Sequence, residues 1–151
     1  MRLLKVAAVS LVLAACNGDP VNVTIEDTTF APSLGVDLAA STQTASGLYY
    51  RDILVGAGNL VGTGTTVAVR YSGYLADGTL FDSNPSPEPV FTFTVDVSSV
   101  IAGFAEGVKG MHAGGRRQLI IPSRLGYGAA GQGSIPPNAI LVFSVEIVTA
   151  S

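Results

Sequence analysis

The stretch TTVAVRYSGYLADGTLFD, residues 65–82, decides the fold that the sequence predicts. It contains two runs with strand character, Thr65–Leu75 and Thr79–Asp82, separated by a turn at Asp77-Gly78. An Asp-Gly pair between apolar runs is a strong signal for a tight hairpin, because Gly tolerates the positive φ that such turns require. The stretch therefore predicts an antiparallel pair of strands in the middle of the chain.

Short alternating runs bounded by Gly, Pro, Asp and Asn recur on both sides of this hairpin and predict further antiparallel strands. In the last run, every second residue from Leu141 to Ile147 is apolar, while Ser144 and Glu146 between them are polar. This pattern indicates one buried face and one solvated face. The further predicted strands are Leu48–Val55, Phe91–Val95, Arg116–Ile121 and Ile140–Thr149.

One helix is predicted, over Val100–Lys109, where apolar residues recur at helical spacing. Ser98 or Ser99 is placed to cap its N-terminus. Many strands and a single short helix predict an α+β domain in which a twisted antiparallel β-sheet is wrapped around the helix.

The composition excludes several classes of function. The chain has 151 residues, a formal net charge of −3, one Cys and one His. A lone Cys16 and a lone His112 leave no disulfide framework and no zinc site built from Cys and His clusters, and we expect no metal and no cofactor. His112 lies in a Gly-rich turn and is predicted to be an exposed loop residue instead of a catalytic base. No stripe of Lys and Arg is present, so nucleic acid is not an expected partner.

The N-terminus predicts export and lipidation. Arg2 and Lys5 precede the uncharged run Val6–Ala15, which is shorter than the roughly 20 apolar residues of a membrane-spanning helix. The sequence Leu13-Ala14-Ala15-Cys16 resembles the lipobox of bacterial lipoproteins, so we expect residues 1–15 to be a signal peptide and Cys16 to carry the lipid. Plain secretion and an uncleaved anchor are the alternatives.

Residues 16–45 are predicted to be the lipidated N-terminus followed by a flexible tether, and residues 46–151 to be the folded domain. The alternative is that this segment docks on the domain, because Phe30, Leu34, Val36 and Leu38 offer apolar surface. The expected location is the bacterial cell envelope. Asn17 is not the Asp that retains many lipoproteins in the inner membrane, which favours the outer membrane, facing the periplasm, in a Gram-negative host.

Aromatic residues are spread over separate predicted elements and allow two interpretations. They can converge on one concave site, or they can simply fill the core. The residues concerned are Tyr71, Phe81, Phe91, Phe104, Tyr127 and Phe143.

The order of short motifs along residues 46–149 resembles FKBP-type peptidyl-prolyl cis-trans isomerases. These motifs are Val69–Gly73, Asp77–Ser83, Phe91–Phe93, Val100–Val108, Gly114–Arg117, Leu125–Gly128 and Ile135–Phe143. Each motif alone is weak, but their shared order is specific. The resemblance implies an isomerase with this fold. Residues 17–45 are too short and too poorly patterned in heptads for a helical dimerisation arm, so we expect a monomer.

The resemblance also implies the site residues. Its catalytic residues would be Tyr71, Phe81, Asp82, Phe104, Tyr127 and Phe143, and its further substrate-binding residues would be Phe91, Val100, Ile101 and Ile135. Phe104 would form the floor of the pocket, where many relatives have Trp. The loop between Tyr127 and Pro136 is one residue shorter than in the best-known members, so residues 132–134 are not assigned.

Such a site would need no covalent chemistry. Rotation about an X-Pro bond breaks amide resonance and removes charge separation, so the transition state is less polar than the ground state, and an apolar pocket favours it. The expected partners are proline-containing segments of unfolded or exported proteins, macrolide inhibitors of the rapamycin type, and the membrane through the lipid anchor. Two alternatives are a non-catalytic binding or chaperone module of the same fold and a structural lipoprotein whose aromatic residues are only core.

Overall fold

The computed structural model describes residues 23–151. The predicted signal peptide and the predicted lipidation site at Cys16 lie outside the described residues. Within residues 23–151, no helix is long and apolar enough to cross a membrane.

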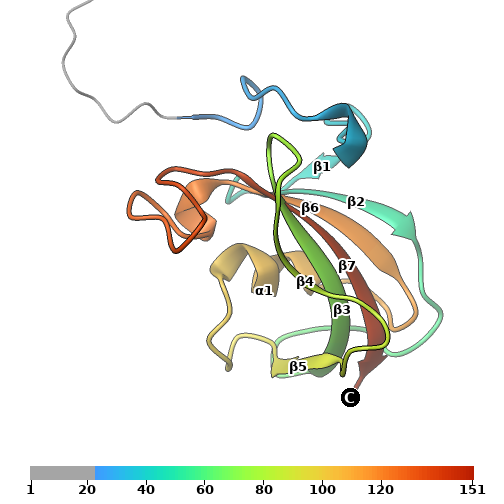
Figure 1. Ribbon diagram of the computed structural model, residues 1–151. Coiled ribbons are helices and arrows are strands. Elements are labelled where there is room, and N and C mark those ends of the chain that lie inside the picture. Colours follow the sequence, from blue (N-terminus) through green and yellow to red (C-terminus); the bar gives the residue numbers. More distant parts are fainter. Residues whose placement is uncertain (1–22) are drawn as a thin grey trace, which may run out of the picture.

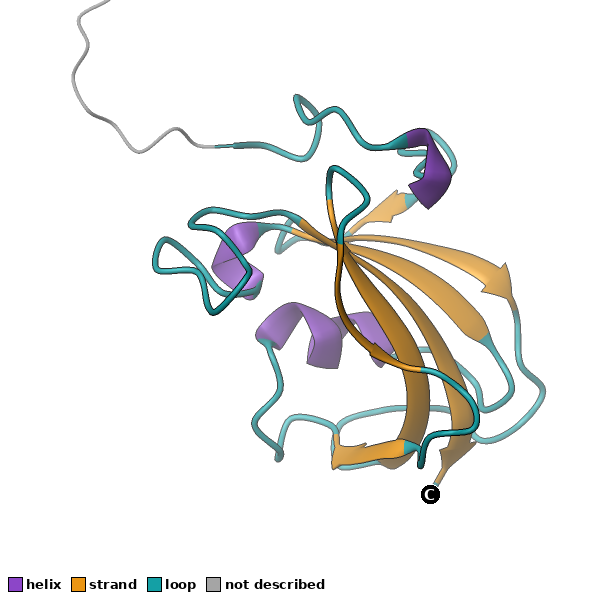
Figure 2. Cartoon of the chain, viewed as in Figure 1, coloured by secondary structure: helices purple, strands orange, loops and turns teal. Residues whose placement is uncertain are grey.

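One strongly curved, antiparallel sheet of seven strands dominates the fold (Figure 1). Its strands lie in the order β1-β2-β6-β7-β3-β4. The strand β5 pairs with the first part of β3, on the same edge as β4, which pairs with its second part. The strands are β1 (Thr42–Gln43), β2 (Tyr49–Leu54), β3 (Thr66–Leu75), β4 (Leu80–Asn84), β5 (Phe91–Thr94), β6 (Arg116–Ile121) and β7 (Leu141–Ala150). The helix α1 (Ala102–Val108) lies on the concave side of the sheet, and two short 3-10 turns, Pro32–Leu34 and Ser123–Leu125, lie in the connections (Figure 2). The predicted α+β class, with an antiparallel sheet around one short helix, is confirmed.

The central hairpin forms as predicted from its turn. Gly78 has a φ of 90°, and the amide of Thr79 donates a hydrogen bond of 2.9 Å to the Asp77 carboxylate. The other predicted strands are all present, with ends that differ from the predicted ones by at most two residues.

The helix is shorter than predicted and has a different cap. It begins after Ile101, and neither predicted serine caps it. Ser98 Oγ instead accepts a hydrogen bond of 2.9 Å from the amide of Thr94, which stabilises the preceding turn. At the other end, the buried Arg117 guanidinium donates to the carbonyl groups of Gly107 and Lys109, each at 3.0 Å. A cation at the C-terminus satisfies carbonyl groups that have no partner within the helix.

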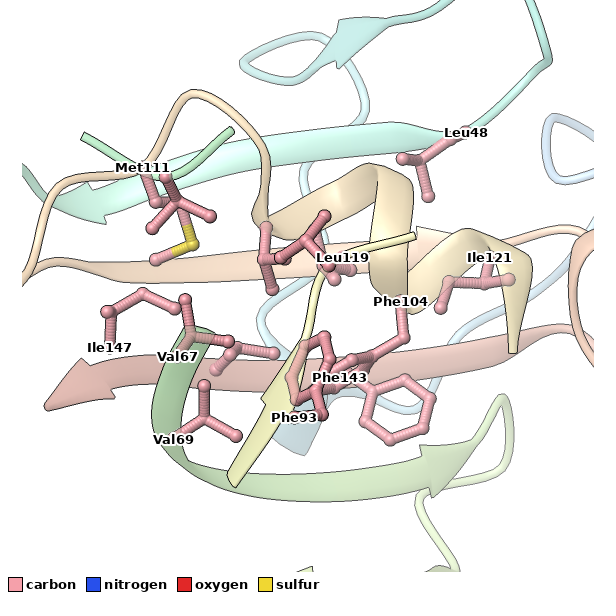
Figure 3. Close-up of a cluster of buried hydrophobic side chains, with 14 of the residues drawn as sticks. Leu48, Val67, Val69, Phe93, Phe104, Met111, Leu119, Ile121, Phe143 and Ile147 are labelled. Atoms are coloured by element: carbon pink, nitrogen blue, oxygen red, sulfur yellow. The ribbon is translucent and has the colours of Figure 1, made fainter. Parts of the chain in front are cut away.

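The main core lies between α1 and the concave face of the sheet (Figure 3). Two helical glycines let the helix approach closely: a Cβ at Gly107 would collide with Leu119, and a Cβ at Gly103 would collide with Ile121. Leu119 and Ile121 are both fully buried on β6. The helix is therefore held against the sheet at a distance that no larger residue allows.

Residues 23–45 differ from the predicted flexible tether. They pack on the convex face of the sheet, where Ile25 is buried with Ile120 and Val142 in a second core cluster. The partly buried residues that contact this cluster are Phe30, Leu34, Val36, Leu38 and Tyr74. The physical reason is that β6 and β7 are apolar on both faces at this end, so their convex side needs a cover. The apolar residues of this segment therefore dock on the domain, as the alternative interpretation of the sequence expected.

Candidate active site

A cavity of about 670 Å³ opens on the concave side of the sheet, beside the start of α1. Side chains from β3, β4, β5, β7, α1 and two loops line it. The lining residues are Tyr71, Asp82, Phe91, Ser99, Val100, Ile101, Phe104, Tyr127, Gln132 and Phe143. All the site residues predicted from the sequence line this cavity except Phe81 and Ile135.

Phe104 forms the centre of an aromatic cluster under the cavity. Its ring centroid lies 5.7 Å from that of Tyr71 and 5.3 Å from that of Phe143, with both pairs close to perpendicular. Phe93, outside the predicted set, lies 5.6 Å from Phe104 on the buried side. Edge-to-face packing of this kind fixes ring positions, because the ring edge is attracted to the neighbouring face. Phe104 is 4% exposed, as a rigid floor would be.

Phe81 and Ile135 do not line the cavity, contrary to the prediction. The Phe81 ring packs edge-on against Phe143, with centroids 5.5 Å apart, and it occupies the space left by the missing side chain of Gly73. Ile135 is 7% exposed and belongs to the main core. Phe81 therefore packs against the wall residue Phe143 without lining the cavity itself, and Ile135 is part of the core.

Tyr71 and Asp82 form a polar pair at the edge of the cavity. The Tyr71 hydroxyl donates a hydrogen bond of 2.8 Å to Asp82 Oδ2. Burial, helped by this hydrogen bond and by the negative charge of Asp82, raises the pKa of Tyr71 to about 12. Tyr71 therefore stays protonated at neutral pH and holds the carboxylate in place. Asp82 is exposed, and its other oxygen, Oδ1, is free to accept a hydrogen bond from a ligand.

Two hydrogen-bond donors of the lining are available to a ligand. Neither the Tyr127 hydroxyl nor the main-chain amide of Ile101 donates to any group within residues 23–151. The Ile101 carbonyl, in contrast, accepts from the amides of Phe104 and Ala105 as α1 begins. The turn into the helix thus leaves one amide without a partner beside the aromatic floor.

Ser99 and Gln132 line the cavity but were not among the predicted residues. Ser99 lies in the loop before α1, next to Val100. Its position beside the predicted residue Val100 is the only feature of the sequence that indicates a place in the lining. Gln132 lies in the loop left unassigned, and its main chain pairs with Ile135 in an isolated bridge. No sequence pattern marks Gln132, because its position depends on how this loop folds back.

The lining offers hydroxyl groups, one carboxylate and one carboxamide, but no imidazole, thiol or amine. His112 is partly buried, with Nδ1 2.9 Å from the Gly58 carbonyl oxygen, and it lines a different, small cavity. Within residues 23–151, no cluster of His, Cys, Asp and Glu side chains could hold a metal ion. The cavity can therefore bind an apolar group of a ligand, donate hydrogen bonds to the ligand's carbonyl oxygens and exclude water. The side chains of the lining do not provide an activated nucleophile.

Comparison with known sequences supports this description. The chain is 45% identical over 103 residues to an FK506-binding protein of Neisseria meningitidis. This match covers 68% of this chain and 94% of the Neisseria protein. It is 46% identical over 107 residues to FK506-binding protein 4 of Dictyostelium discoideum, of which it spans only 29%.

Solved structures give the same result. FkpA from Escherichia coli superposes with a TM-score of 0.69 at 38% identity, covering 74% of this chain and 52% of FkpA. A peptidyl-prolyl cis-trans isomerase from Pseudomonas syringae superposes with a TM-score of 0.66 at 34% identity, covering 74% of this chain and 81% of that one. The model of the family described as FKBP-type peptidyl-prolyl cis-trans isomerase matches residues 58–148. The chain therefore belongs to the FKBP-type peptidyl-prolyl cis-trans isomerases, a family of enzymes that rotate the bond before proline.

Proposed function

We propose that the cavity over Phe104 is the site at which this isomerase twists the X-Pro bond, and that it acts by excluding water instead of by covalent chemistry. The observation that carries the proposal is the aromatic floor of Tyr71, Phe104 and Phe143 beneath a cavity with two unpartnered donors. The proline ring would lie on this floor, between Phe91 and the side chains of Val100 and Ile101.

The physical basis is the change of polarity during rotation. In the planar amide, resonance places negative charge on oxygen and positive charge on nitrogen, and the twisted amide loses this separation. An apolar site therefore stabilises the transition state relative to the ground state, which is the condition for catalysis. The Ile101 amide and the Tyr127 hydroxyl would hold substrate carbonyl groups, and Asp82 Oδ1 would accept a hydrogen bond from the substrate.

The test is a protease-coupled isomerase assay on a short X-Pro peptide with Phe91→Ala. Phe91 is 38% exposed and stacks on Phe93 at 5.6 Å, so its removal opens the cavity wall with less damage to the core than removal of Phe104. We expect kcat/KM to fall about tenfold, as expected when one apolar wall of a binding site is lost. Phe30→Ala on the convex face is the matched control and should keep its activity. Equal activity of both variants would contradict the assignment of the cavity.

Macrolides of the FK506 and rapamycin type are proposed ligands of the same cavity. Support comes from the name of the Neisseria relative, an FK506-binding protein, and from the mostly apolar lining. Titration calorimetry with FK506 should show binding that competes with the X-Pro peptide. Binding without competition would place the macrolide elsewhere.

We further propose that the enzyme is a monomeric lipoprotein of the bacterial envelope, anchored at Cys16 and acting on exported proteins. Support comes from the motif Leu13–Cys16 and from Asn17, which favours the outer membrane. Residues 23–45 pack on their own sheet, which leaves them unavailable as a dimerisation arm. Mass spectrometry of the mature N-terminus should show a lipid-modified Cys16, and analytical ultracentrifugation of the Cys16→Ser protein should give a monomer. An unmodified Cys16 would refute the anchor.

A further inference from the structure

The convex face of the sheet carries a polar groove that the isomerase site does not use. Strand register places Ser72, Ser144 and Gln118 side by side on β3, β7 and β6. The next row toward the far end of the sheet contains Arg70, Glu146 and Arg116. Residues directly opposite one another on adjacent strands share a face, and the alternating partners of these six point into the core. These six residues therefore lie on the side of the sheet opposite the catalytic cavity, and Tyr71 contributes to the lining on both sides.

Two connected cavities make up this groove. The first, of about 360 Å³, lies between the sheet and the docked segment around Leu34, and the second, of about 290 Å³, lies along β3 toward Asn84. Arg116 and Ser144 line both cavities, so the two form one continuous surface. Their combined extent is sufficient for several residues of an extended polypeptide.

The two cavities are lined by two basic residues, Arg70 and Arg116, and by one acidic residue, Glu146, so the groove has a net positive charge in an acidic protein. The chain carries a net charge of −3, yet Arg51, Arg70 and Arg116 gather on this face. The only ion pairs in the described part of the chain are Lys109–Asp96 and Arg117–Asp52. Glu146 lies opposite both Arg70 and Arg116 in register but forms an ion pair with neither. Arg70 Nη1 donates a hydrogen bond of 2.8 Å to the Glu88 carbonyl oxygen, but neither arginine has a carboxylate partner within residues 23–151, so both can pair with a carboxylate from outside.

The groove also contains polar atoms that lack partners. Within residues 23–151, the buried side-chain atoms without a hydrogen bond are Gln118 Oε1, Asn84 Oδ1 and Arg51 Nε. Gln118 and Asn84 line the two cavities, and Arg51 lies opposite Gln118 on β2. Buried polar atoms are normally paired. Gln118 Nε2 and Asn84 Nδ2 donate to the carbonyl oxygens of Leu34 and Pro89, which leaves the two side-chain oxygens without a donor. A ligand amide would reach these buried oxygens once the two side chains rotate, and Arg70 and Arg116 can pair with an anion.

We propose that this groove binds an acidic, extended segment of polypeptide, whose main-chain amides pair with Gln118 and Asn84 and whose Asp or Glu side chains pair with Arg70 and Arg116. A polypeptide supplies donors and anions together, as the groove requires. Because the groove faces away from the catalytic cavity, a bound segment need not contain proline. The enzyme would then hold polypeptide on two faces.

The test measures fluorescence anisotropy of a labelled, proline-free peptide with alternating Glu and Ser, added to the full-length chain in a neutral detergent. A peptide with Gln in place of Glu is the control ligand. We expect the Glu peptide to bind, the Gln peptide not to bind, and Arg70→Glu/Arg116→Glu to weaken binding by about tenfold or more, as expected for the loss of two partly exposed ion pairs followed by repulsion. Arg124→Glu is the matched control, because Arg124 donates to the Ser46 carbonyl oxygen and does not line the groove. This variant should bind the Glu peptide as tightly as the unchanged protein does.

Several outcomes would overturn the proposal. Equal binding by the double variant, or equal weakening by Arg124→Glu, would show that the groove is not the site. Displacement of the peptide by a short X-Pro substrate would place it in the catalytic cavity. If the unchanged protein binds no peptide, two further measurements identify the occupant. Loss of self-association in the double variant would assign the face to a second copy of the chain. Loss of binding to phosphatidylglycerol vesicles in the double variant would assign it to a membrane. Isomerase activity on a short X-Pro peptide, measured in parallel, should be the same in all variants, so failure of this proposal leaves the catalytic assignment intact.

Discussion

At the scale of single residues, the cavity separates groups that hold the fold from groups that can only serve a ligand. Phe104 and Phe143 are both 4% exposed and belong to the main core, so replacing either by Ala would cost about 3–5 kcal/mol of stability as well as activity. The Tyr127 hydroxyl, in contrast, has no hydrogen-bond partner within residues 23–151.

Tyr127→Phe should therefore lower activity without lowering stability. Removing one hydrogen bond to a substrate carbonyl is expected to reduce kcat/KM about threefold to tenfold. The urea midpoint should not change, because the hydroxyl has no partner within the described residues. Tyr50→Phe is a matched control, since the Tyr50 ring packs under Arg117, 4.4 Å from the guanidinium carbon, away from the cavity. Full activity of Tyr127→Phe would remove this hydroxyl from the mechanism.

The raised pKa of Tyr71 predicts how stability depends on alkaline pH. A tyrosine with a folded-state pKa of about 12, compared with an ordinary value of 10.0, favours folding fully below pH 10, and this contribution is lost as the pH rises from 10 to about 12. The free energy of unfolding should fall over this range in the unchanged protein and fall less in Tyr71→Phe. Urea titrations at several pH values measure the difference, and parallel curves for the two proteins would show that Tyr71 titrates normally.

At the scale of elements, the position of α1 depends on its two glycines. Gly usually weakens a helix by about 1 kcal/mol relative to Ala, but at Gly107 a Cβ would meet the fully buried Leu119. The steric cost exceeds the gain in helix propensity, because a close-packed core does not yield easily. Arg117 holds the end of the same helix through the carbonyl groups of Gly107 and Lys109. The floor residue Phe104 lies on the helix between Gly103 and Gly107, the two glycines that fix the distance of α1 from the sheet.

Gly107→Ala should destabilise the protein by about 1–3 kcal/mol, in spite of the better helix former. It should also reduce isomerase activity, since moving α1 away from β6 displaces Phe104 and Ile101. Gly62→Ala is the matched control, because a Cβ there would meet nothing within 4 Å. Chemical denaturation of the two variants tests this, and a Gly107→Ala protein as stable as Gly62→Ala would mean that the sheet accommodates the methyl group.

At the scale of the whole molecule, the sheet is covered on both faces, and the second cover is the segment that the sequence presented as a tether. The end of this segment and the residue after it are hydrogen-bonded to the helix: Glu106 on α1 accepts from Thr44 Oγ1 at 2.8 Å and from Ser46 Oγ at 2.6 Å. Its first part covers Ile120 and Val142 on the convex face. The segment thus covers the convex face of the sheet and is linked to α1 by hydrogen bonds.

A chain beginning at Ser41 should keep its isomerase activity but lose stability. It retains Thr44 and Ser46 at the helix, while the apolar cover of the convex face is removed. Uncovering several apolar side chains should lower the free energy of unfolding by about 2 kcal/mol or more, after allowance for the entropy that the removed segment regains. Activity and urea denaturation, measured on the same preparation, test the two halves of the prediction. Unchanged stability would show that the docked segment contributes little, and lost activity would show that it also shapes the cavity.

Local sequence patterns determined the strands, the Asp77-Gly78 turn and the approximate helix, because each depends on neighbouring residues in the chain. The order of the motifs determined the family and most of the cavity lining. The tertiary structure decided the rest: Phe81 and Ile135 pack in the core without lining the cavity, Gln132 lines it, and residues 23–45 cover the convex face of the sheet. These features depend on which surfaces meet when the chain folds, and periodicity along the chain does not record contacts between distant residues.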